Sequence, residues 1–367
     1  MKKNNKNLII EKINLLETNF EKVLYNPDTF FMENLKTCSF ATDDIEKYRY
    51  WEWTQGVGLF GLWKMYEYTG DEKCLKKLIA YYDERLCQGL PAKNINTMAP
   101  LLTLTYVYQK TMDKKYLEVC EKWAKWLMDD LPRTEEGGFQ HLTSDTLNQN
   151  ELWVDTLFMA VLFLARMAVI LERKEYMDEA EYQFLLHIKY LYDKSTGLWF
   201  HGWTFEKRNN FANALWGRGN CWVTLAIPEF LQIGRFSPCL KKYLINALLC
   251  QIKALKKFQK DNGMWTTLID NPRSYEEASA TCGFGAGILS AINKGYINNE
   301  YAKMALKPLD RVLNLIDCEG ILNQVSYGTP MGRDSKDFYL NIPICCMPYG
   351  QALGMLYLIE CLKTGLD

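Results

Sequence analysis

Strongly apolar segments of helix length alternate along the chain with amphipathic segments. The apolar segments are hydrophobic nearly all round, as expected of helices packed on every side. They are Trp53–Thr69, Thr97–Thr111, Trp153–Leu171, Trp216–Ile233, Ser279–Ile292 and Cys346–Lys363. The amphipathic segments are Leu8–Leu24, Glu72–Cys87, Lys114–Asp130, Glu175–Tyr192, Lys241–Lys260 and Glu300–Ile316. We therefore predict six inner helices and six outer ones, with strand signals confined to the turns.

A glycine turn recurs before four of the inner segments. Its copies begin at Gly137 (GGFQH), Gly197 (GLWFH), Gly263 (GMW) and, without the aromatic residue, Gly320 (GIL). These glycines are 60, 66 and 57 residues apart, and self-similarity at a near-constant period indicates stacked supersecondary units. The pattern predicts an all-α (α/α)6 barrel that forms a single domain over residues 1–367. The N-terminal helix is expected to close the barrel beside the last inner helix.

Composition and charge narrow the class of protein. The net charge is −1, with no basic face of the kind that nucleic-acid binding needs. The most apolar stretch, 152–171, contains Asp155 and Arg166 and is therefore interpreted as a core helix instead of a membrane span. The basic N-terminus has no apolar core of a signal peptide. Twelve cysteines without a CxxC pair favour free thiols in a reducing compartment, hence a cytoplasmic protein. Three histidines argue against a His-rich metal site.

The N-termini of the inner helices converge at one mouth of such a barrel. Polar and aromatic residues at these positions are expected to face a cleft. They are Trp53, Asn96, His141, Asp155, His201, Arg218, Trp222 and Glu277.

Asp155 is the only acid between Trp153 and Leu171. One interpretation is a helix cap, since Asp is favoured in a first helical turn. The other is a general acid, whose pKa burial would raise and the helix dipole would lower.

His141 and His201 each end a repeat turn, so they are candidates for the same site, while His187 is interpreted as structural. Arg218 needs an anionic partner, which is either a substrate carboxylate or an internal acid. Trp53 and Trp222 would form part of a sugar-stacking wall, or of the core.

Several ordered motifs resemble glycoside hydrolase family 105, the unsaturated rhamnogalacturonyl hydrolases, which are close to the unsaturated glucuronyl hydrolases of family 88. The motifs are Gly137–His141, Leu152–Met159, Thr196–Trp203, Trp216–Arg218 with Trp222, Ile292–Tyr296 and Val325–Thr329. The resemblance implies an (α/α)6 barrel without metal or cofactor. It also implies oligosaccharide substrates that carry a 4,5-unsaturated uronic acid at the non-reducing end.

The reaction implied by the resemblance is hydration of the enol ether. An Asp protonates C4 and activates water for C5, and the hemiketal that forms opens and releases the next sugar. The family roles fall on Asp155 as acid/base and on His201, Arg218 and Trp222 around the unsaturated sugar. His141 and Trp53 are expected to join them.

The chain departs from the family at Asn96, where the family usually has a second Asp, and no nearby acid replaces it without a shift of the helix register. Two alternatives therefore accompany the prediction of a hydrolase. One is an (α/α)6 sugar epimerase that uses His141 and His201, and the other is a sugar-binding pseudoenzyme that has lost its second carboxylate. The sequence leaves the uronic acid, the next sugar and the oligomeric state open.

Overall fold

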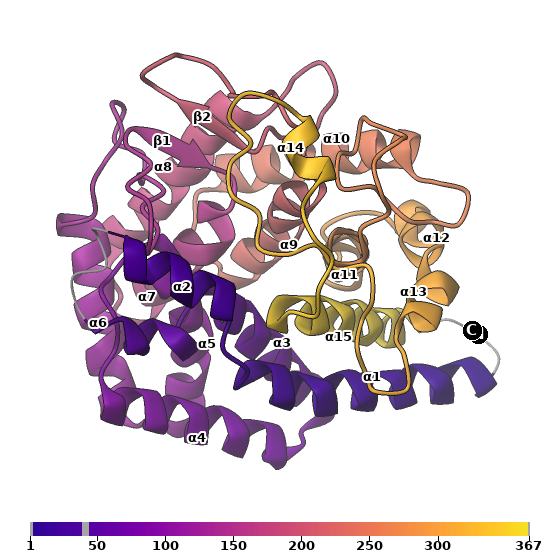
Figure 1. Cartoon of the computed structure of the whole chain (residues 1–367), viewed down its shortest axis with the longest axis horizontal. Coiled ribbons are helices and arrows are strands. Elements are labelled where there is room, and N and C mark those ends of the chain that lie inside the picture. The colour runs from indigo at the N-terminus through magenta and orange to yellow at the C-terminus, as the bar shows by residue number, and fades with distance from the viewer. Residues whose placement is uncertain (1–2, 39–43, 366–367) are drawn as a thin grey trace.

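The computed structural model describes residues 3–38 and 44–365. Six inner helices form a ring: α3 (Trp53–Thr69), α5 (Ile95–Thr111), α7 (Leu162–Ile170), α9 (Gly217–Ile233), α11 (Ala278–Asn293) and α15 (Pro348–Lys363). Along the chain these inner helices alternate with the outer helices α4 (Glu72–Gln88), α6 (Lys114–Asp129), α8 (Lys174–Leu191) and α10 (Pro238–Phe258) (Figure 1). The last inner helix packs against the first and closes the ring. The predicted (α/α)6 barrel is confirmed.

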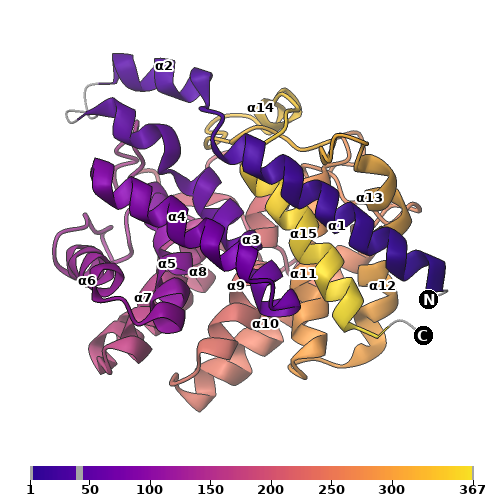
Figure 2. The ribbon, with the colours of Figure 1, turned by 90° about the horizontal axis from the view of Figure 1, so that it is seen from below.

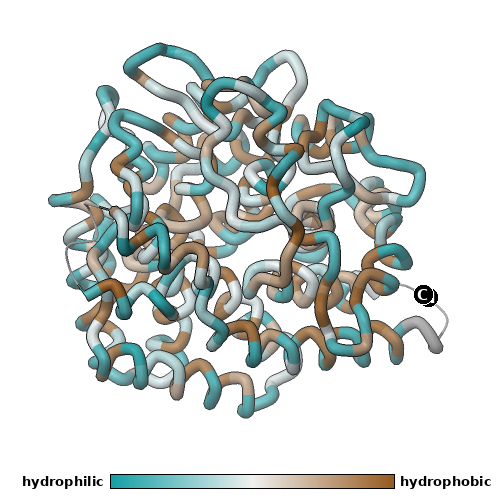
Figure 3. The backbone as a smooth tube through the Cα atoms, viewed as in Figure 1, coloured by the Kyte–Doolittle hydropathy of each residue, from teal (hydrophilic) through white to brown (hydrophobic). Residues whose placement is uncertain are grey.

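The N-terminal helix α1 (Lys3–Leu24) lies along α15, as the sequence predicted (Figure 2). Its buried residues recur at helical spacing and face the barrel: Ile9, Ile13, Leu16, Phe20 and Leu24. Along this helix hydrophobic and hydrophilic segments alternate, while the loops at the top of Figure 3 are largely hydrophilic. No helix in the described part of the chain is long and apolar enough to cross a membrane.

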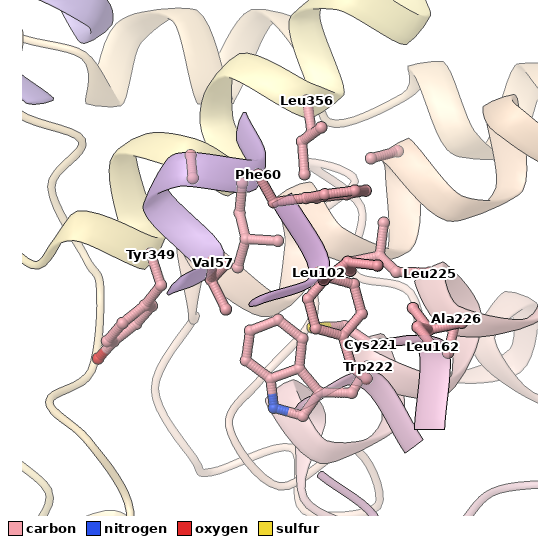
Figure 4. Packing of buried hydrophobic residues seen from close by; sticks show 14 of the residues in the cluster. Val57, Phe60, Leu102, Leu162, Cys221, Trp222, Leu225, Ala226, Tyr349 and Leu356 are labelled. Carbon is pink, nitrogen blue, oxygen red and sulfur yellow. The ribbon is translucent and has the colours of Figure 1, made fainter. Parts of the chain in front are cut away.

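Glycines on the inner helices let neighbouring backbones approach closely. A Cβ atom at Gly61 of α3 would lie 2.7 Å from the Cβ of Ala352 on α15. A Cβ atom at Gly287 of α11 would lie 2.3 Å from the carbonyl oxygen of Thr224 on α9. Larger side chains fill the axis between these seams, among them Phe60, Leu102 and Trp222 (Figure 4). The apolar character of the inner segments thus reflects close packing on all sides.

The recurring turns share one backbone conformation. Gly137, Gly197, Gly263 and Gly320 have φ between 77° and 87°, a region that L side chains rarely adopt. Each glycine N–H donates to a carbonyl three or four residues earlier. The repeat detected in the sequence is therefore a repeat of structure, and it places an equivalent turn before each of four inner helices.

The third inner segment begins differently from the prediction. Residues Glu151–Trp153 form strand β1, which pairs antiparallel with β2 (Gly202–Thr204), and a π-helical turn at Leu157–Val161 precedes α7. The Val154 N–H donates to the His201 carbonyl at 2.9 Å, so this backbone is not free to start a helix. The predicted helix start at Trp153 is wrong, and π-turns of this kind are frequent at functional sites.

The last amphipathic segment, predicted as one helix over 300–316, is divided into η3 (Asn299–Tyr301), α12 (Ala302–Leu306) and α13 (Leu309–Leu315). Pro308 has no N–H and interrupts the helical hydrogen bonds there. Two further elements, α2 (Thr29–Thr37) and the 3-10 turn at Ile45–Tyr50, lie between α1 and α3, and the short helix α14 (Asp337–Leu340) precedes α15.

Ionic side chains are buried near the C-terminal ends of the inner helices, away from the mouth. Lys64 of α3 lies 3.2 Å from Glu229 of α9, and Tyr106 of α5 donates a hydrogen bond to the same carboxylate. Lys294, after α11, approaches Glu229 to 3.7 Å. Because a buried charge needs partners, this cluster fixes four inner helices relative to one another.

Candidate functional site

A cavity opens at the mouth where the inner helices begin. Four of the predicted residues line it: Trp53, Asn96, His141 and Asp155. Other lining residues come from the start of α2, the 3-10 turn and the start of α3, from β1 and the turn before it, and from the segments that precede α9 and α15; they include Asp28, Phe30, Arg49, Glu52, Asp145, Trp153, Trp216, Tyr327 and Thr329. The cavity therefore combines aromatic rings with carboxyl, amide and hydroxyl groups, a composition suited to a small polar ligand.

Backbone hydrogen bonds bring two repeat turns to Asp155. The His141 N–H donates to the Glu151 carbonyl at 3.0 Å, and the Val154 N–H donates to the His201 carbonyl at 2.9 Å. As a result His201 Nε2 lies 3.4 Å from Asp155 Oδ2. His141 stacks on Trp153 with a centroid distance of 4.4 Å. The structure thus places His201 beside Asp155, while His141 and Asp155 line the same cavity.

Asp155 does not cap the helix that follows it. Its carbonyl oxygen accepts from Phe158 and Met159 at 3.0 Å, while its side chain turns toward His201. Burial works to raise the pKa of this carboxyl, but the contact with His201 and the charge of Arg218 outweigh burial and lower it. In the free protein Asp155 is therefore a carboxylate at neutral pH.

Two other histidines are buried and neutral. His141 Nδ1 lies 2.8 Å from Thr156 Oγ1, and burial lowers the pKa of His141 to about 3. His187 lies in α8 with Nδ1 2.7 Å from the Gln183 carbonyl, and burial lowers its pKa to about 4. His187 is thus structural, as expected, whereas the His141 ring borders the cavity.

Arg218 is fully buried and its partners are internal. Nη1 donates to the Ser326 carbonyl at 3.0 Å, and Nη2 donates to the Tyr327 carbonyl at 2.9 Å and to Thr329 Oγ1 at 2.8 Å. Glu277, the N-cap of α11, provides the nearby negative charge, with its Oε1 3.8 Å from Arg218 Nη1. Of the two partners considered for Arg218, the structure supplies the internal acid. Arg218 and Glu277 hold residues 326–329, of which 327–329 line the cavity, and do not line it themselves.

We expect Arg218→Lys to weaken this support, because an ammonium group cannot reproduce the two-pronged contact with residues 326–329. Losing hydrogen bonds to a charged group should cost about 1.5–3 kcal/mol of unfolding free energy, measured by urea denaturation. Activity should fall by the same factor on a uronate substrate and on its carboxyl-reduced analogue. A loss of activity on the uronate substrate alone would instead indicate that Arg218 contacts the substrate carboxylate directly.

The two predicted tryptophans occupy different layers. Trp53 lines the cavity, stacks on Tyr349 at 4.7 Å and meets Trp222 edge to face at 6.3 Å. Trp222 has no exposed surface and packs among the core residues of Figure 4, with its ring 5.3 Å from that of Phe158. The expectation that Trp222 faces the cleft is not met, because α9 directs this ring toward the barrel axis.

Asn96 lies in the first turn of α5 and faces the cavity. The capping role belongs to Asn94, whose side chain accepts from the Thr97 N–H at 3.0 Å. Asn94 also donates to Ser144 Oγ at 3.0 Å, and Ser144 in turn contacts Glu52. This leaves the Asn96 amide available at the cavity wall.

Glu52 is a cavity residue that sequence reasoning missed. It is the N-cap of α3, accepts from the Trp53 N–H at 3.1 Å and is hydrogen-bonded by Ser144. Burial raises the pKa of Glu52 to about 8, and the charges of Asp145 and Asp28 act in the same direction. A carboxyl group other than Asp155 therefore reaches this cavity from the start of α3, which packs against the helix that carries Asn96. Its place directly before Trp53 is the signal that could have revealed it.

The part of the chain that the structure describes contains no group of three or more His, Cys, Asp or Glu residues arranged to hold a metal ion. The site combines Asp155 and further carboxyl groups with two imidazole rings and several indole rings at the N-terminal mouth of an (α/α)6 barrel.

The chain belongs to glycosyl hydrolase family 88, whose family model matches residues 28–365. Unsaturated rhamnogalacturonyl hydrolase YesR of Bacillus subtilis is 31% identical over 317 residues, which cover 86% of this chain and 90% of the relative.

Two solved structures, each described as a possible member of family 105, are similar over nearly the whole chain. The one from Salmonella enterica is 43% identical with a TM-score of 0.89 and covers 98% of this chain and 95% of its own. The one from Klebsiella pneumoniae is 42% identical with a TM-score of 0.88, and the match covers 97% of this chain and 94% of the Klebsiella chain. The predicted relationship to families 105 and 88, and with it the hydrolase class, is confirmed.

Proposed function

We propose that this hydrolase releases the 4,5-unsaturated uronic acid from the non-reducing end of oligosaccharides by hydrating the enol-ether double bond. The observation that carries the proposal is Asp155: a carboxylate at the cavity wall that caps no helix and faces His201 at 3.4 Å. The name of the Bacillus subtilis relative, an unsaturated rhamnogalacturonyl hydrolase, supports the same substrate type.

In this proposal Asp155 delivers a proton to C4 of the unsaturated sugar, and water adds its oxygen to C5 while Asp155 accepts the proton released. The resulting hemiketal opens, and the next sugar leaves with its oxygen protonated. Asp155 is ionised in the free protein and must gain a proton first. An anionic uronate bound beside it favours this, because a like charge disfavours the charged form of a carboxyl group.

Trp53, Asn96 and His141 are proposed to contact the sugar, since all three line the cavity. Arg218 would act on the sugar through residues 326–329, and His201 would act through Asp155. Trp222 would act through Trp53. We propose a single catalytic domain, consistent with one hydrophobic cluster that extends from Ile9 to Cys361. A cytoplasmic location is also proposed, supported by the twelve free cysteines.

The test is incubation of the purified protein with a panel of lyase-generated oligosaccharides that differ in uronic acid and in the next sugar. We expect at least one to lose the ultraviolet absorbance of the conjugated uronate and to yield a free neighbouring sugar. An isomerised product of unchanged mass would indicate an epimerase. Saturable binding without turnover across the panel would indicate a pseudoenzyme and contradict the proposal.

A further inference from the structure

Tyr339 lies outside the cavity lining but contacts the side chain that faces Asp155. It is carried by α14, in the segment that crosses the mouth before α15 (Figure 1). Its ring has no exposed surface and packs against Trp216. Its hydroxyl lies 2.7 Å from His201 Nδ1. Asp155, His201 and Tyr339 thus form a continuous chain of polar contacts from the cavity wall into the protein.

The other contacts of Tyr339 decide which way the hydrogen bond to His201 runs. The Gly332 N–H donates to the Tyr339 hydroxyl oxygen at 3.1 Å. The remaining acceptor for the phenolic proton is Met331 Sδ at 3.9 Å, and thioether sulfur is a weak acceptor. Burial raises the pKa of Tyr339, so the phenol keeps its proton. The better acceptor for that proton is the lone pair of His201 Nδ1.

A neutral imidazole that accepts at Nδ1 carries its own proton on Nε2. That atom is the one that faces Asp155 Oδ2 at 3.4 Å, and neither of these two buried atoms has a closer polar partner in the described part of the chain. The Trp216 ring, 4.2 Å from the imidazole centroid, limits the rotation of His201.

We propose that Tyr339 is a positioning residue, which holds neutral His201 in its Nε2–H form so that the ring donates toward Asp155. The proposal extends the proposed function, since it gives the carboxylate a donor that is in place before substrate arrives. In a neutral imidazole, the hydrogen bond made by one ring nitrogen determines whether the other nitrogen carries the proton and acts as donor. The charged or titratable groups that bear on the pair are Asp155 itself, His141 and Arg218.

The first test reads the proton position directly from the ¹⁵N resonances of histidine-labelled wild-type protein, under mildly alkaline conditions where imidazole is neutral. The chain has only three histidines. His187 is an internal reference, because a carbonyl can only accept and its Nδ1, 2.7 Å from the Gln183 carbonyl, must carry the proton. We expect His201 to show the opposite pattern, with the proton on Nε2. A proton on His201 Nδ1 overturns the proposal, whether or not any substrate is turned over.

The second test is a double-mutant cycle on a substrate that the oligosaccharide panel identifies. Tyr339→Phe should lower kcat about two- to tenfold, as expected for one hydrogen bond. In the His201→Gln background the same change should have no further effect on the residual kcat. Equal losses in both backgrounds would mean that Tyr339 does not act through His201.

A matched control separates positioning from general loosening of the segment. Lys336 lies on the same segment and pairs with Asp270 at 2.8 Å, away from His201. Lys336→Gln should keep kcat within about twofold of wild type, because the ion pair that it removes is half-exposed and does not include His201. A loss as large as that of Tyr339→Phe would attribute the effect to the segment and contradict the proposal. Absence of turnover on every substrate would contradict the proposed function, while the ¹⁵N result would still decide the role of Tyr339.

Discussion

Asp155→Asn is expected to lower kcat about 10²–10⁴-fold on any oligosaccharide that the wild type hydrates, because the amide cannot give a proton to C4. The fold should be retained. Asn has the same shape, its oxygen can face His201 Nε2 as the carboxylate does, and the wild-type side chain caps no helix. Substrate should bind at least as tightly as it does to wild type, because the amide lacks the charge that opposes a bound uronate. The measurements are kcat, the melting temperature and equilibrium binding.

Asp145→Asn is the matched control, since Asp145 also lines the cavity and is hydrogen-bonded by Thr143 Oγ1 at 2.8 Å. We expect this variant to lose less than tenfold in kcat. If Asp155→Asn also loses less than tenfold, Asp155 is not the proton donor, and Glu52 becomes the carboxyl group to test next.

Glu229→Gln is expected to lower the unfolding free energy by about 3 kcal/mol at neutral pH. Removing one partner of a buried pair leaves an uncompensated charge, which costs about 3–5 kcal/mol. The lower end applies here, because Lys64 keeps a second partner, Glu67, at 2.9 Å. Urea denaturation measures the effect, and kcat should stay near the wild-type value because the cluster lies at the far end of the barrel.

The loss should depend on pH in a defined direction. Burial works to raise the pKa of Glu229, but Lys64 and Lys294 outweigh it and lower the pKa from 4.5 to about 2. A carboxyl group whose pKa is lower in the folded protein than in the unfolded chain stabilises the folded state at pH values above its unfolded pKa. That stabilisation is lost as the pH falls toward the folded pKa. The difference between wild type and variant should therefore be full above about pH 5 and shrink toward pH 2.

Asp178→Asn serves as the control for Glu229→Gln. Its partner Lys174 is 84% exposed, so the pair is solvated and the unfolding free energy should change by less than about 0.5 kcal/mol. A change at Glu229 no larger than this would show that the buried cluster contributes little.

The helices and the repeat were predictable because their signals are local. An inner helix is apolar on all sides, and a glycine at positive φ marks each turn, so Gly137, Gly197 and Gly263 could be read directly. The start of the third inner helix could not, because the backbone from 151 to 154 pairs with residues 201–204, about 50 positions later. Periodicity within one segment does not register such long-range pairing.

The same distinction holds for the site. Trp53, Asn96, His141 and Asp155 were predictable from their place at the start of inner helices or turns. Arg218 occupies the expected element, but its side chain finds internal partners about 110 residues further along, and no local pattern indicates this. Tyr339 belongs to an irregular segment without periodicity, so nothing in the sequence singled it out.

The segment that carries Tyr339 also constrains how the chain folds. Arg333 reaches back to Glu151 on β1, 182 residues earlier, and α1 meets the turn before Leu322 through Lys12 and Ile316, 304 residues apart. The early repeats can stack on their neighbours as they leave the ribosome, as in a linear repeat array. The ring itself closes only when the last repeat arrives, so contacts of very high sequence separation come last and slow the final step. Tyr339 reaches His201 in that step, so Asp155 gains its full support only when the last repeat has joined the ring.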